Sequence, residues 1–250
     1  MTAPLEPPAF MTPPSPAWPF LPAPEPAPRL FVSHFDHQRF HAEAWQQAGF
    51  ECPAPLASAV AKRHAEYLAG RCCAREGLRA LGHADTPLAP QPDRQPQWPV
   101  QACGAITHSH GLAAAVVAPR RDWAGVGTDA EQWLDGARAE RIAPAVLTPR
   151  EHQALAAIAP EHRARCVTLA FSLKESLFKA LYPLTGTRFY FRDAELDPQA
   201  LLRLREPRGR CRLALLRPLS GAWPAGTHIE GHFAELAGRA MTFIGVSQGV

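Results

Sequence analysis

Between residues 162 and 181, apolar and polar residues alternate with the period of an α-helix. The apolar positions of the second half of this stretch are Ala170, Leu173, Leu177 and Leu181. Pro183 is expected to end the helix. The opposite side carries Glu175 and Lys179. Alone, such a pair is typical of a solvent-exposed helix, which it stabilises by about 0.3 kcal/mol.

A second long helix is expected over residues 56–81, where apolar residues recur at helical spacing and Gly82 can serve as the C-terminal cap. Its polar side is basic and carries Lys62, Arg63, Arg71, Arg75 and Arg79. Taken alone, this basic side favours a solvated helix face over an anion-binding surface.

The remaining pattern predicts shorter elements. Short helices are expected at 38–47, 137–142 and 149–158, and strands at 30–35, 112–118, 123–131, 188–196, 212–217, 228–235 and 240–247. Helices followed by antiparallel strands indicate an α+β protein. Because the order of helix and then strands recurs, we expect two similar halves, residues 29–124 and 125–250.

Residues 1–28 contain many prolines and few charges. Proline cannot donate a backbone hydrogen bond, so we expect an extended or disordered leader that precedes the two halves. A ligand for a proline-binding partner is the alternative interpretation.

Composition narrows the class of protein. A net charge of +3 suits an anionic small ligand or an acidic protein partner, and is too small to argue for nucleic acid. No apolar run is long enough to span a membrane, and the N-terminus lacks the pattern of a signal peptide. The six cysteines have no C-x-x-C spacing, which favours buried free thiols in the reducing cytoplasm.

Two features suggest phosphate chemistry. The chain has only three lysines among its 26 Lys and Arg residues, and two of them, Lys174 and Lys179, lie in one predicted helix. Asp129 and Glu131 share one face of a predicted strand. Alone, such an acidic pair is usual at an exposed strand edge, but neighbouring carboxylates also suit Mg²⁺.

A hydroxyl and an imidazole lie next to each other at Thr107 and His108, and His110 follows. The two histidines suggest zinc, but no third soft ligand is near in sequence. The hydroxyl and imidazole pair fits a phosphate contact better.

These segments, taken in order, resemble the 4′-phosphopantetheinyl transferases of the surfactin and enterobactin synthetase type. The G-[IV]-D-x-E strand of that family corresponds to residues 127–131, and its [WF]-[SA]-x-K-E-[SA]-x-x-K-A helix to residues 171–180. The A-E-x-L-A-G-R helix of the enterobactin branch corresponds to residues 65–71, and a proline-containing loop with its Ser/Thr-His pair to residues 94–108. The sequence departs from the family at Thr128 and Ala130, where larger aliphatic residues are usual.

The resemblance implies a pseudo-dimer of two α+β halves with coenzyme A bound between them. It implies Asp129, Glu131 and Glu175 as ligands of Mg²⁺, with Glu175 and Lys179 as the catalytic residues. The coenzyme A contacts that it implies are Arg63, Arg71, Arg94, Thr107, His108, Lys174 and Lys179.

The reaction implied is transfer of 4′-phosphopantetheine from coenzyme A to a serine of an apo acyl or peptidyl carrier protein. Glu175 would accept the serine proton, directly or through water, and adenosine 3′,5′-bisphosphate would leave. No nucleic-acid partner is expected, and two halves in one chain favour a monomer. Two rivals are another Mg²⁺-dependent phosphoryl or phosphodiester enzyme, such as a nuclease, and a non-catalytic protein that binds coenzyme A or carrier domains.

Overall fold

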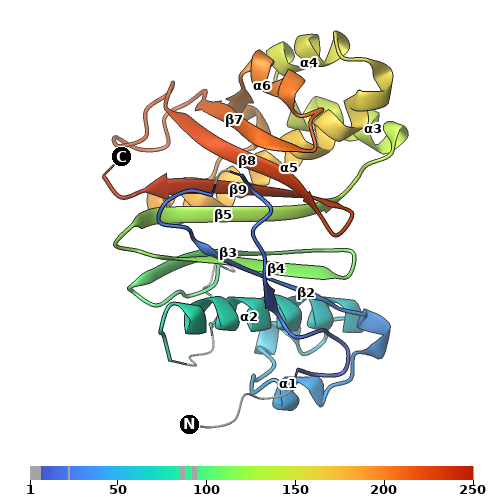
Figure 1. Ribbon diagram of the computed structural model, residues 1–250, viewed down its shortest axis with the longest axis vertical. Coiled ribbons are helices and arrows are strands. Elements are labelled where there is room, and N and C mark those ends of the chain that lie inside the picture. The colour runs from blue at the N-terminus through green and yellow to red at the C-terminus, as the bar shows by residue number, and fades with distance from the viewer. Residues whose placement is uncertain (1–6, 22, 85–87, 90, 92–94, 250) are drawn as a thin grey trace. The chain divides into compact units, whose positions relative to one another are not determined.

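Two antiparallel sheets, each covered by a long helix, make up the computed structural model (Figure 1). The structure describes residues 7–21, 23–84, 88–89, 91 and 95–249. The chain divides into two compact units: the first holds the residues up to Trp18 and Ala27–Pro119, and the second holds Pro19–Pro26 and the residues from Arg120 onward. The prediction of an α+β fold is confirmed.

The first unit has a four-stranded sheet in the order β1-β2-β4-β3. Its strands are β1 (Ser15–Pro16), β2 (Arg29–His34), β3 (Ala102–Ser109) and β4 (Leu112–Pro119). Helix α2 (Ala61–Ala80) packs on this sheet, and the shorter elements are η1 (His37–Arg39), α1 (Ala44–Gln47) and η2 (Ala54–Leu56). Gly77 permits the close contact, because a Cβ there would lie 2.6 Å from the Val117 side chain.

The second unit has a five-stranded sheet in the order β5-β9-β8-β7-β6. Its strands are β5 (Trp123–Gln132), β6 (Ala194–Leu196), β7 (Arg208–Leu215), β8 (His228–Leu236) and β9 (Arg239–Ser247). Helix α5 (Pro160–Thr185) packs against β5 and β9. The shorter elements are α3 (Gly136–Val146), α4 (Pro149–Ala156), η3 (Phe191–Asp193) and α6 (Pro198–Arg203).

The long helix of the second unit differs from its prediction at the end. Pro183 does not end α5, which continues to Thr185. A proline this near the C-terminus removes a single helical hydrogen bond, so the last turn can still form. The helix ends where Gly186 takes the left-handed conformation at φ 64° and its N–H donates to the Tyr182 carbonyl.

Of the two forms expected for the leader, the residues that the structure describes are ordered and partly extended instead of disordered. Strand β1 pairs antiparallel with β2, with Ser15 opposite Val32. The side chains of Phe10, Met11 and Phe20 are buried. Proline is tolerated in an edge strand, and the burial of these apolar side chains outweighs the missing donors.

Two smaller findings bear on the sequence predictions. All six cysteines are free, and all but the exposed Cys52 are buried. Across the described segments, α5 included, no helix has both the length and the apolar character needed to cross a bilayer.

Candidate active site

A cluster of acidic residues with a lysine lies where β5 faces α5 in the second unit. Asp129 is buried, and its Oδ1 accepts a hydrogen bond from Lys179 Nζ at 2.7 Å. Its Oδ2 accepts one from Ser172 Oγ at 2.9 Å. Lys179 also donates to the Thr128 carbonyl at 3.1 Å. The strand carboxylate and the helix ammonium that the sequence singled out therefore form an ion pair.

Glycine makes this approach possible. A Cβ at Gly127 would lie 1.9 Å from the backbone oxygen of Ser176, so no other residue fits between β5 and α5. Gly127, Asp129 and Glu131 share one face of β5 because side chains alternate along a strand. The acidic residues thus point to the side of the sheet that α5 covers.

The carboxylates influence one another through space. Burial, followed by the nearby Asp129 carboxylate, raises the pKa of Glu131 to about 7, and Glu175 adds to the shift. Burial also raises the pKa of Glu175, an effect that Lys179 opposes and Asp129 reinforces. Such repulsion between carboxylates is what a bound cation relieves.

The carboxylates fit Mg²⁺ in their chemistry, since all three supply hard oxygen ligands. Among the residues that the structure describes, no three His, Cys, Asp or Glu side chains are arranged to hold a metal ion as they stand. Both oxygens of Asp129 accept hydrogen bonds from protein groups, and Lys179 provides the nearby positive charge.

A separate basic cluster lies in the first unit, where α2 packs on β3. Arg63 Nη1 lies 3.1 Å from His108 Nε2. Glu66 lies close to both, at 3.6 Å from Arg63 and 3.8 Å from His108 Nδ1. Thr107, next to His108 on β3, is buried. The sequence did not single out Glu66, although its place three residues after Arg63 on a helix would have suggested a shared face.

Arg71 is a buried cation on α2. Only 4% of its surface is exposed, its Nη2 donates to the Tyr67 hydroxyl at 3.0 Å, and its guanidinium lies over the Tyr67 ring. Its Nη1 has no hydrogen-bond partner among the described residues. Burial lowers the pKa of Arg71. A buried guanidinium whose Nη1 donor has no partner among the described residues is suited to an anionic ligand.

Two predicted coenzyme A contacts need separate comment. The side chain of Lys174 is buried, and its Nζ donates to Glu151 Oε2 at 2.6 Å. The prediction that Lys174 binds a phosphate is therefore wrong for this structure, because its charge is already paired away from solvent. Arg94 lies outside the described residues.

Comparison with known proteins identifies the family. Residues 52–118 match a family model described as the 4′-phosphopantetheinyl transferase N-terminal domain, and residues 125–217 match the 4′-phosphopantetheinyl transferase superfamily. The chain belongs to this superfamily. The two matches include the helix with Arg63 and Arg71 and the strand and helix with Asp129 and Lys179.

Curated relatives agree with the family assignment. The chain is 41% identical to 4′-phosphopantetheinyl transferase Svp of Streptomyces mobaraensis over 59% of this chain and 60% of that protein. It is 38% identical to enterobactin synthase component D of Escherichia coli O157:H7, over 51% and 59% of the two chains. It is 34% identical to PptT of Mycobacterium tuberculosis, over 57% and 62%. The chain thus spans about three fifths of the length of these relatives.

Proposed function

We propose that the protein transfers the 4′-phosphopantetheine group of coenzyme A to a serine of an apo acyl or peptidyl carrier protein. The observation that carries this proposal is the ion pair of Asp129 with Lys179, next to Glu131 and Glu175, inside the region that matches the superfamily. The names of the relatives Svp and PptT support it.

The residues of the second unit would carry the chemistry. Glu175, whose pKa burial raises above its ordinary value, is the candidate base for the serine proton, directly or through water. Lys179 would stabilise the oxygen of the leaving adenosine 3′,5′-bisphosphate. Asp129 holds Lys179 in place through their 2.7 Å contact.

Asp129, Glu131 and Glu175 are the residues that would hold Mg²⁺. When bound, the ion would neutralise the negative charge of the pyrophosphate of coenzyme A. Removing divalent cations with a chelator should therefore stop transfer.

The residues of the first unit would bind the nucleotide end of coenzyme A. Arg63 Nη1 lies 3.1 Å from His108 Nε2, which places a guanidinium and an imidazole together, and Arg71 adds a buried guanidinium whose Nη1 has no partner among the described residues. Thr107 and Arg94 are proposed as further residues that contact coenzyme A. The position of coenzyme A between the two halves stays a prediction.

We further propose that the protein acts as a monomer in the cytoplasm. The five buried free thiols fit a reducing compartment. Size-exclusion chromatography with light scattering would test the oligomeric state.

The decisive experiment is to incubate the protein with coenzyme A, Mg²⁺ and several apo carrier proteins, and to weigh the carriers by mass spectrometry. We expect a mass gain of one phosphopantetheine group, which disappears when the acceptor serine is replaced by alanine. If no carrier gains mass while coenzyme A binds, the protein is a non-catalytic binder. Cleavage of a nucleic acid with no carrier modified would favour the nuclease alternative.

A further inference from the structure

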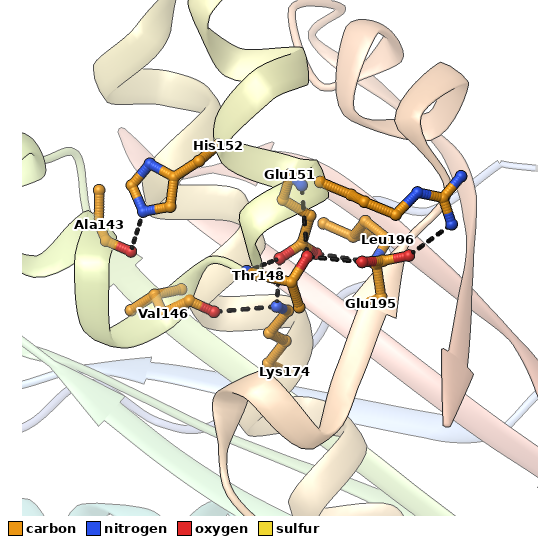
Figure 2. Close-up of polar contacts among 9 residues, drawn as sticks. Ala143, Val146, Thr148, Glu151, His152, Lys174, Glu195 and Leu196 are labelled. Carbon is orange, nitrogen blue, oxygen red and sulfur yellow. Dashed lines mark hydrogen bonds and ion pairs between the residues drawn. The ribbon is translucent and has the colours of Figure 1, made fainter. Parts of the chain in front are cut away.

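A buried ion pair between Lys174 and Glu151 joins α5 to α4. Lys174 Nζ and Glu151 Oε2 are 2.6 Å apart, with 1% and 0% of their side chains exposed. Lys174 points from α5 toward Glu151 and the Val146 carbonyl in Figure 2. Neither charge belongs to the proposed transfer chemistry, and both are costly to bury.

Backbone groups also bond to both members of the pair. Glu151 accepts from the backbone N–H of Thr148 and from that of Leu196, each at 2.7 Å. Lys174 donates to the carbonyl of Val146 at 2.9 Å. One carboxylate and one ammonium therefore tie α5 to the end of α3, the start of α4 and strand β6.

A second carboxylate extends the network toward the surface. Glu195 accepts from the Thr148 hydroxyl at 2.6 Å and from Arg150 at 2.9 Å. Thr148 is the N-cap of α4 and forms a capping box with Glu151. The network thus fixes the start of α4, which carries Glu151, against β6.

The opposite side of α5 is hydrogen-bonded to β9. Ser172 Oγ and Ser176 Oγ lie 2.8 and 2.7 Å from Thr242 Oγ1 on β9. Lys174 is two residues after Ser172, so it lies about 200° around the helix from it. Polar contacts on both sides of α5 therefore oppose rotation of the helix about its axis.

We propose that Lys174 and Glu151 are positioning residues, which hold α5 in the rotation that directs Glu175 and Lys179 toward Asp129. This inference rests on the proposed transferase activity. Glu175 follows Lys174 directly in the helix, so a turn of the helix that breaks the buried pair would also move Glu175. Lys174 therefore acts on the reaction through the helix and makes no contact with coenzyme A.

Two variants test the proposal. Lys174→Met keeps most of the length of the side chain and leaves Glu151 buried without its partner, which is the costly way to break a buried pair. Lys174→Met combined with Glu151→Gln removes both charges. For transfer to an apo carrier, measured well below the unfolding temperature of each variant, we expect the single change to lower kcat by about ten-fold or more. The KM for coenzyme A should stay within about two-fold of the wild type.

The double variant should recover part of the lost kcat and of the lost unfolding temperature, because no charge is left unpaired. The recovery should be incomplete, because glutamine keeps an acceptor oxygen for only one of the two backbone N–H groups, of Thr148 and Leu196, that donate to Glu151. Arg210→Met, which breaks an exposed ion pair in the same unit, is the matched control and should change neither quantity. If Lys174→Met does not fold, the double variant decides the matter through its kcat and its calorimetric affinity for coenzyme A.

Other results would overturn the proposal. A rise of ten-fold or more in the KM and calorimetric Kd for coenzyme A, not recovered in the double variant, would mean that Lys174 contacts the substrate. An unchanged kcat in the single variant would mean that the pair does not position α5. Failure of the wild type to modify any carrier would count against the transferase activity alone, since unfolding temperature and coenzyme A binding do not depend on transfer.

Discussion

Gly127 illustrates how a single residue determines where the acidic side chains lie. A methyl group at this position would overlap the Ser176 carbonyl, so Gly127→Ala should push α5 away from β5. We expect a loss of about 1–3 kcal/mol in the free energy of unfolding, as for other overpacked cores. Gly136→Ala is the control, because a Cβ there has no neighbour within 4 Å. Urea unfolding of both variants measures the difference, and equal stabilities would contradict the close packing.

Glu175 is the residue whose role the proposed chemistry depends on most. Glu175→Gln keeps the shape of the side chain but removes its ability to accept a proton, so transfer should fall by at least about 100-fold. Glu161→Gln, at the exposed start of the same helix, is the matched control and should keep normal rates. The rate of carrier modification gives the comparison. A Glu175→Gln variant with near-normal rates at saturating Mg²⁺ would rule out Glu175 as the base.

At the residue scale, the sequence indicated the meeting of Asp129 and Lys179 more directly than the contacts of Lys174 or Glu66. Asp129 and Lys179 were named from their spacing and from the family resemblance, and their side chains meet in the structure. Lys174 was misassigned because its partner Glu151 is 23 positions away, and only the fold shows that the two are buried together. The place of Glu66 beside Arg63 and His108 also depends on how α2 packs on β3.

At the scale of elements, the leader is the least expected part of the structure. Phe20 is 1% exposed and packs against His232 and Phe243, whereas the next residue, Leu21, is 52% exposed. Phe20→Ala should therefore destabilise the protein by about 3–5 kcal/mol through lost burial and a cavity. Leu21→Ala should cost under about 0.5 kcal/mol. Thermal unfolding compares the two, and equal losses would mean that Phe20 does not pack as described.

Helical and strand periodicity predicted the long elements, since α2, α5, β4, β5, β8 and β9 lie close to the expected ranges. The periodicity failed to predict elements whose formation depends on tertiary contacts. Strand β1 forms in a proline-rich segment because β2 offers it an edge. The strand expected at 188–196 is a 3₁₀ turn followed by the three residues of β6. Its short length reflects its place at the edge of the five-stranded sheet.

At the scale of the whole molecule, His232 links stability to pH. Burial lowers the pKa of His232, an effect that Glu230 opposes and Arg210 reinforces. The unfolded chain, with an ordinary pKa of about 6.5, therefore binds a proton at higher pH than the folded protein does. This contribution to stability is present above pH 6.5 and is lost as the pH falls below it.

We expect the free energy of unfolding to fall between about pH 7.5 and 5.5, and to fall less in His232→Phe, which cannot be protonated and suits the surrounding rings. His41→Asn removes an exposed histidine and should follow the wild-type profile. Urea unfolding at each pH gives the data. Parallel profiles for His232→Phe and the wild type would contradict the link.

The second unit is built from two separate pieces of the chain. Its core includes Phe20, and the Trp123 indole donates to the Pro26 carbonyl at 3.1 Å. A recombinant fragment starting at residue 120 would therefore lack an integral part of this unit and leave Phe243 uncovered. Adding a synthetic peptide of residues 19–26 should restore its stability by fragment complementation. To isolate the second unit, one must therefore supply two polypeptides, or join the peptide of residues 19–26 to the fragment through an artificial linker.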